Sequence, residues 1–156
     1  WLAVGAAAVV VAVSAGVQWK LHQWSLAQAQ LRQVIAEHVP ADSVVLTNQL
    51  ATNKALSPVY GSNRPQIFFD DTDPRSPAAQ LAAEQKLAEQ VQTLLGRNRP
   101  VFIVVLLRDG SEFWQSQNQQ NLGMVSSLEK GFVVRPVYDE SLAGADKVRI
   151  WEVRRR

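Results

Sequence analysis

The chain contains no cysteine, which excludes disulfide bonds, zinc sites built from thiolates and cysteine nucleophiles. Histidine is almost as scarce, because only His22 and His38 occur and both fall in one expected helix. Without a histidine near the loops that contain serine and aspartate, no Ser-His-Asp triad can be assembled. The sequence also has no G-x-G-x-x-G turn and no P-loop, which argues against dinucleotide and nucleoside-triphosphate binding by the familiar routes. The residues therefore display no catalytic centre.

Charge is absent from the first part of the chain, where residues 1–19 are uncharged and Lys20 is the first charged residue. A helix needs roughly 20 mostly apolar residues to cross the hydrocarbon core of a bilayer. The run predicts a transmembrane helix over residues 1–19, truncated at its N-terminus, with Trp19 and Trp24 at the membrane interface. Two alternatives remain. A signal peptide is suggested by the small residues of Val-Ser-Ala-Gly, and a buried core helix is disfavoured because the run has no polar face.

The charges that are present nearly cancel, with 16 Lys and Arg against 14 Asp and Glu. No broad basic stripe exists, so we expect no nucleic-acid partner. Arg154, Arg155 and Arg156 are expected to form a solvated chain end, although such a tail could also meet anionic lipid headgroups.

Residues 20–40 predict an amphipathic stalk helix that leaves the membrane and docks on the following domain. Its apolar positions recur at steps of three and four and therefore share one face. These positions are Trp24, Ala27, Leu31, Val34, Ile35 and His38. Pro40 ends the helix, because proline lacks an N–H and disfavours helix at the residue before it.

Residues 41–156 predict a soluble α/β domain. Strands are expected at 43–47, 66–69, 101–107, 132–138 and 147–153, with helices at 49–60, 77–95, 111–117 and 122–130. This alternation predicts a three-layer α/β sandwich with a mostly parallel sheet.

Two strand signals specify the sheet further. The continuously apolar strand 101–107 is expected at its centre, covered on both faces. The short connection between the last two strands leaves no room for a crossover helix, which predicts an antiparallel pair at the sheet edge. Pro136 suits an edge position or a bulge, and the Gln/Asn-rich residues 115–121 are expected in an exposed helix end or loop.

An acidic cluster, Asp70, Asp71 and Asp73, follows the second expected strand. Ligands of open α/β sheets gather beyond the carboxyl ends of strands, and carboxylates suit Mg²⁺ or Mn²⁺. The Asp71-Thr72-Asp73 spacing also matches the Asp-x-Asp signature of nucleotide-sugar glycosyltransferases. The alternative is that these are turn and capping residues before Pro74. Apart from Mg²⁺ or Mn²⁺ at this cluster, we expect no cofactor in the chain.

A second group of polar residues, Asp109-Gly110-Ser111, follows the central strand and is expected to form a turn and a helix N-cap. Glu112 could assist there as an acid in the first helical turn. Three aromatic residues, Trp114, Tyr138 and Trp151, are expected to fill the core or, alternatively, to form a surface on which a sugar stacks.

The order of these segments resembles the C-terminal end of a polytopic membrane glycosyltransferase. The resemblance is carried by the last apolar helix, by the passage LRQVIAEHVPADSVV at residues 31–45, and by a small α/β domain ending in VRIW at residues 148–151. The type is similar to the protein mannosyltransferase and aminoarabinose transferase group. It implies sugar transfer from a polyprenyl-phosphate donor, an integral membrane protein of the cell membrane, and an extracytoplasmic α/β domain.

The same resemblance implies that the catalytic carboxylates lie in loops between membrane helices outside this sequence, so no catalytic residue is assigned here. The expected partners are the lipid bilayer, the remaining membrane helices of the same polypeptide and a lipid-linked sugar or acceptor. Two alternatives stay open. One is a single-span anchored α/β module that binds or scaffolds partners, and the other is a metal-dependent enzyme centred on the acidic cluster.

Overall fold

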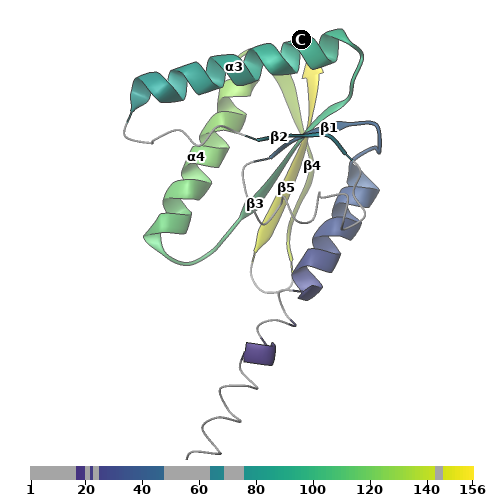
Figure 1. The fold of residues 1–156 in the computed structure, drawn as a ribbon, viewed down its shortest axis with the longest axis vertical. Helices are drawn as coiled ribbons and strands as arrows, with labels where there is room; N and C mark the ends of the chain where they lie inside the picture. The colour runs from purple at the N-terminus through teal and green to yellow at the C-terminus, as the bar shows by residue number, and fades with distance from the viewer. Residues whose placement is uncertain (1–16, 20–21, 23–24, 48–63, 69–75, 143–145) are drawn as a thin grey trace, which may run out of the picture.

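The computed structural model describes residues 17–19, 22, 25–47, 64–68, 76–142 and 146–156. An N-terminal helix covers residues 25–38. It is followed by β1 (Val44–Thr47), β2 (Gln66–Phe68), α3 (Pro77–Gly96), β3 (Val101–Leu107), α4 (Glu112–Glu129), β4 (Phe132–Ser141) and β5 (Lys147–Arg155). The fold is mixed α/β, as Figure 1 shows.

The predicted membrane segment, residues 1–19, is described only at residues 17–19, which are helical; residues 1–16 lie outside the described part. Among the described residues, no helix is both long enough and apolar enough to cross a bilayer. The helix expected at 49–60 also lies outside the described residues.

The five strands form one sheet in the order β2-β1-β3-β5-β4. β1 pairs in parallel with both β2 and β3, whereas β5 pairs antiparallel with both β3 and β4. Four strands therefore run in one direction and β5 alone runs in the other. The prediction of a mostly parallel sheet with an antiparallel edge pair is confirmed.

The apolar strand β3 lies at the centre of the sheet, as its sequence predicts, and Val101, Ile103, Val104 and Val105 are fully buried. β4 is an edge strand, and its register with β5 shifts between Pro136 and Tyr138. Proline cannot donate a hydrogen bond to a neighbouring strand, so an edge strand with a bulge is where it is tolerated.

The N-terminal helix covers one face of the sheet. Leu31 and Ile35 are completely buried, and they pack with Val104 of β3 and with Val148 and Ile150 of β5. The end of the helix is held by Arg64, whose guanidinium donates to the carbonyl oxygens of Val39 and Pro40. The helix is therefore a layer of the core, and its buried face is the one that the three- and four-residue spacing indicates.

α3 and α4 cover the opposite face, which gives the three layers visible in Figure 1. Leu87 and Val91 of α3 and Val125 and Leu128 of α4 pack against the other side of β1, β3 and β5. α3 begins as predicted, because the hydroxyl of Ser76 accepts a hydrogen bond from the N–H of Ala79 and proline follows at the first helical position.

The prediction of two short helices at 111–117 and 122–130 is wrong, because one continuous helix, α4, spans both ranges. The Gln/Asn-rich residues 115–121 lie inside it. The buried residues Asn121, Met124, Val125 and Leu128 keep the helical spacing across the break expected near residue 121. Packing of this face against the sheet stabilises a helix that the local sequence does not favour.

Candidate functional site

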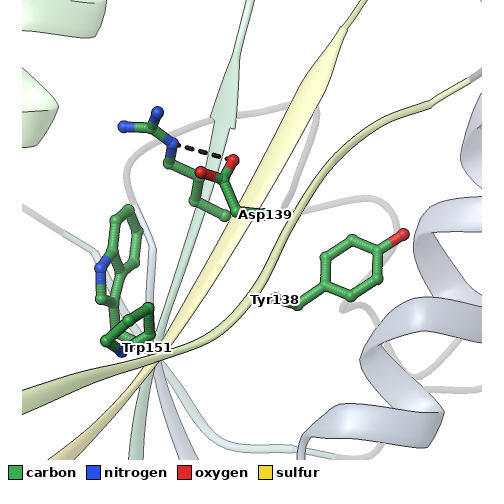
Figure 2. Close-up of a pocket in the computed structure, with 5 residues that line it drawn as sticks. Tyr138, Asp139 and Trp151 are labelled. Carbon is green, nitrogen blue, oxygen red and sulfur yellow. Dashed lines mark hydrogen bonds and ion pairs between the residues drawn. The ribbon is translucent and has the colours of Figure 1, made fainter.

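A shallow hollow of about 190 Å³ lies on the face of the β4–β5 ribbon. Its lining residues are Pro136, Tyr138, Asp139, Arg149 and Trp151 (Figure 2). We call it the β4–β5 hollow. Pockets that enclose drug-sized ligands have volumes of about 300–1,000 Å³, so this hollow can take a single ring or a small polar group.

The bulge in β4 builds this hollow. Pro136 pairs with Trp151 and Asp139 pairs with Arg149. In a regular strand, two residues three positions apart point to opposite faces. The register shift at Val137 instead places Pro136 and Asp139 on one face, opposite two β5 residues that are two positions apart. Pro136 and the carboxylate of Asp139 are therefore neighbours because of one extra residue.

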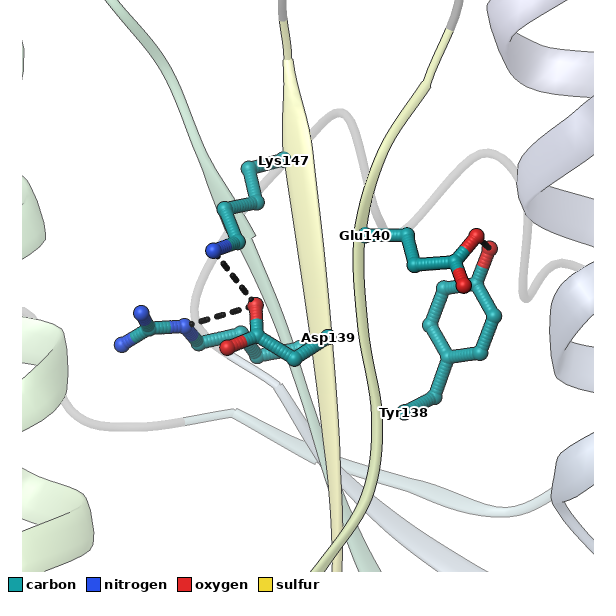
Figure 3. Close-up of polar contacts among 5 residues, drawn as sticks. Tyr138, Asp139, Glu140 and Lys147 are labelled. Carbon is teal, nitrogen blue, oxygen red and sulfur yellow. Dashed lines mark hydrogen bonds and ion pairs between the residues drawn. The ribbon is translucent and has the colours of Figure 1, made fainter.

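Two cations share the carboxylate of Asp139. Its Oδ1 lies 2.8 Å from Nζ of Lys147 and 3.0 Å from Nε of Arg149 (Figure 3). All three side chains are partly exposed, and together they carry one net positive charge. The hydrogen bond from Lys147 lowers the pKa of Asp139 despite some desolvation, and Arg149 acts in the same direction. Asp139 is therefore an ionised acceptor and not a proton donor near neutral pH.

The hydroxyl of Tyr138 belongs to the other face of β4, although the residue lines the hollow. Figures 2 and 3 show its side chain pointing away from that of Asp139. Its ring centroid lies 4.8 Å from that of His38 in the N-terminal helix, and its hydroxyl donates to Glu140 at 3.3 Å. Desolvation and the negative charge of Glu140 raise the pKa of Tyr138, so the phenol keeps its proton at neutral pH.

A second polar cluster lies where β3 ends and α4 begins. The guanidinium of Arg108 lies 4.6 Å from the ring centroid of Trp114, and its Nε lies 3.8 Å from Oδ2 of Asp146. The amide side chain of Asn118 bonds both the N–H and the carbonyl of Arg108. Burial raises the pKa of Asp146, and the positive charge of Arg108 opposes that shift.

The predicted site residues are only partly brought together. Tyr138 and Trp151 line the same hollow, whereas Trp114 belongs to the Arg108 cluster. Asp109 and Ser111 are exposed between β3 and α4, where Gly110 has a φ of 128° and residue 111 is the N-cap. The metal candidates Asp70, Asp71 and Asp73 lie outside the described residues. Within the described residues, no group of three or more His, Asp or Glu side chains could hold a metal ion.

Sequence reasoning missed the polar half of the hollow, namely Asp139 and Arg149, and Lys147, which pairs with Asp139. One signal was present: Lys147, Arg149 and Trp151 alternate along the last strand and must share a face. The partner strand gave no such signal, because the bulge at Val137 changes which of its residues join them.

The ion pairs of Asp139 predict a pH-dependent stability difference between the wild type and Asp139→Asn. The pKa of Asp139 is lower in the fold than in the unfolded chain, so its contribution is present above the unfolded pKa and is lost as the pH falls through the folded pKa. Because the pairs are exposed, we expect the wild type to be more stable at pH 7 by at most about 1 kcal/mol. Urea unfolding at a series of pH values should show this difference shrinking below about pH 4.

The matched control for this titration is Glu140→Gln, which removes a carboxylate from the same strand on the opposite face. Glu140→Gln leaves Lys147 and Arg149, the two cations that pair with Asp139, in place. A difference between wild type and Asp139→Asn that stays constant from pH 7 to pH 3 would contradict the assigned role of the two cations.

No protein family, curated protein or solved structure matches the chain.

Proposed function

We propose that the chain is a membrane-attached, non-catalytic domain of a polyprenyl-phosphate glycosyltransferase, on the extracytoplasmic side, and that it binds a sugar in the β4–β5 hollow. The observation that carries this proposal is the combination of Trp151 with the Asp139–Arg149 pair in a hollow the size of one ring. A pyranose has an apolar C–H face and a rim of hydroxyls. An aromatic ring packs on the face, while a carboxylate accepts from hydroxyls and a guanidinium donates to them.

The charge state of the hollow supports binding and not catalysis. A general acid or base needs a pKa near the working pH, whereas the two cations lower the pKa of Asp139 and keep it ionised. The resemblance noted above places the catalytic carboxylates elsewhere in the polypeptide, which agrees with a domain that holds a ligand without transforming it.

The N-terminal helix supports a fixed attachment. Because Leu31 and Ile35 are buried in the core, the orientation of the sheet is coupled to the N-terminal helix over residues 25–38. The proposed membrane segment over residues 1–19 would therefore hold the hollow at a defined position relative to the bilayer.

The proposal predicts that the protein binds simple glycosides and that binding depends on Asp139. Saturation-transfer NMR with methyl mannoside, glucoside, galactoside and 4-amino-4-deoxyarabinoside should show transfer to the ring protons of at least one. Hydrogen bonds to charged groups contribute about 1.5–3 kcal/mol, so Asp139→Asn should weaken the affinity roughly tenfold or more.

The control for this experiment is Trp114→Phe, which changes an aromatic residue outside the hollow and should leave the affinity unchanged. Trp151→Phe keeps an apolar ring and should weaken binding less than Asp139→Asn does. Absence of transfer to all four glycosides, or equal affinity of the wild type and Asp139→Asn, would sink the sugar-binding proposal. The single-span scaffolding module and the metal-dependent enzyme centred on the acidic cluster would then be the remaining candidates.

A further inference from the structure

Two adjacent aromatic residues, Phe113 and Trp114, lie in the first turn of α4 at the surface. Phe113 is 61% exposed. Its ring packs edge-on against Trp114 with centroids 5.0 Å apart, and Trp114 in turn lies under the guanidinium of Arg108. Isolated exposed apolar residues are ordinary on protein surfaces. This pair differs because the guanidinium of Arg108 packs over the Trp114 ring, while Phe113 beside it stays largely exposed.

The pair lies at the end of the domain where the N-terminal helix enters. α4 begins directly after β3, so its first turn lies beyond the carboxyl end of that strand. The N-terminal helix leads into β1, whose first residue, Val44, pairs with the first residue of β3. Figure 1 shows the start of this helix and the first turn of α4 at the same end of the sheet, with the segment 17–19 lying beyond that end.

The segment 17–19 adds exposed apolar surface at this end, because Trp19 is 65% and Val17 is 53% exposed. The sixteen residues before it are uncharged. Aromatic side chains are enriched at the level of lipid headgroups, where one side of the ring is apolar and the other is wet. Trp19 and Phe113 are both exposed aromatic side chains of the kind that a lipid interface accepts.

The charges around the aromatic pair indicate whether anionic lipid headgroups would be attracted to it. Arg108 is paired with Asp146, and Lys147, which lies opposite Leu107 at the end of β3, is paired with Asp139. Asp109 and Glu112 are exposed beside Arg108. Because both cations already have a carboxylate partner and two further acidic residues are exposed, attraction to anionic headgroups is not what holds the surface. We infer that Phe113 and Trp114 contact the headgroup region of the bilayer that residues 1–19 enter, and that this contact does not require anionic lipid. This inference depends on the proposed membrane attachment, but not on sugar binding.

The test uses the absence of cysteine, which makes Phe113→Cys and Leu81→Cys single-thiol proteins. Leu81 is 55% exposed on α3, which crosses the opposite end of the sheet in Figure 1. Each variant of the 156-residue chain is labelled with an environment-sensitive fluorophore and reconstituted into phosphatidylcholine vesicles that carry a nitroxide on the headgroup. We expect the label at 113 to be quenched several-fold more strongly than the label at 81. Replacing a third of the lipid with phosphatidylglycerol should leave both values unchanged.

Each outcome bears on a separate step. The vesicles are first floated in a density gradient to show whether the protein is attached to them. Equal quenching at the two positions in protein that floats would contradict contact of Phe113 and Trp114 with the lipid, but not the membrane attachment itself. Protein that does not float with the vesicles would contradict both the membrane attachment and the contact of Phe113 and Trp114 with lipid. Quenching at 113 that appears only with phosphatidylglycerol would show that the contact requires anionic lipid, against the inference. Glycoside binding, measured on the same preparations, reports on the hollow independently.

Discussion

Val104→Asp is expected to abolish folding of the α/β domain. Val104 is completely buried in the middle of the central strand, where it packs with the N-terminal helix and β5. An ionised carboxylate at this position would have no partner, and the cost of burying it is comparable to the whole free energy of unfolding of a domain, about 5–15 kcal/mol. Circular dichroism and the dispersion of amide resonances should show loss of the native state.

The matched control is Val133→Asp, the same substitution in the same sheet. Val133 is 46% exposed on the edge strand β4, and it pairs in register with Arg154. An opposite charge directly across a strand pair is favourable by about 0.2–1 kcal/mol, so this variant should fold. A cooperative unfolding transition in Val104→Asp at wild-type denaturant concentrations would refute the assignment of β3 as a strand covered on both faces.

Ile35→Ala is expected to have the second largest effect. Ile35 is fully buried between the N-terminal helix and the sheet. Truncation of a buried isoleucine removes apolar surface and leaves a cavity, which costs about 2–5 kcal/mol. Urea unfolding of the 156-residue chain in mild detergent, followed by tryptophan fluorescence, should show a free energy of unfolding that is lower by that amount.

Leu26→Ala on the same helix is the comparison for Ile35→Ala. Leu26 is 40% exposed, and surface substitutions change the free energy of unfolding by about 0.5 kcal/mol or less. Two variants with the same midpoint would mean that the helix does not stabilise the domain. A large difference between them would show that the helix and the sheet unfold as one unit.

The sequence predicts most of this fold because its strands and helices differ sharply in period. The seven apolar residues of β3 have no polar interruption, so both their length and their central place can be derived from the residues alone. The proline and serine at the start of α3 mark its first turn in the same direct way. The edge pair of β4 and β5 follows from a connection too short for a helix.

The continuity of α4 could not be derived locally. Residues 115–121 contain only polar side chains, which on their own predict a loop. The helix continues because Asn118 bonds the backbone of Arg108 and because Met124 and Val125 reach the sheet. The contacts of Met124 and Val125 form only when the sheet is assembled, and the helix propensity of residues 115–121 carries no information about them.

The candidate site shows the same limit. The aromatic half of the hollow could be suspected from Trp151 and Tyr138, but the place of Asp139 in its charged half depends on a one-residue bulge. A shift of one residue moves every side chain beyond it to the other face. Which of Asp139 and Glu140 joins Arg149 is therefore decided by the register at Val137 and not by the alternation of either strand.

The position of β5 in the sheet affects how the domain can fold while it is being synthesised. Of the five strands that the structure describes, β5 is synthesised last, yet it lies between β3 and β4 and touches both. Until the ribosome has released it, β3 and β4 each present an unpaired edge, and Val104 and Ile103 lack their partners on β5. The nascent domain is therefore exposed to mispairing for longest at its centre.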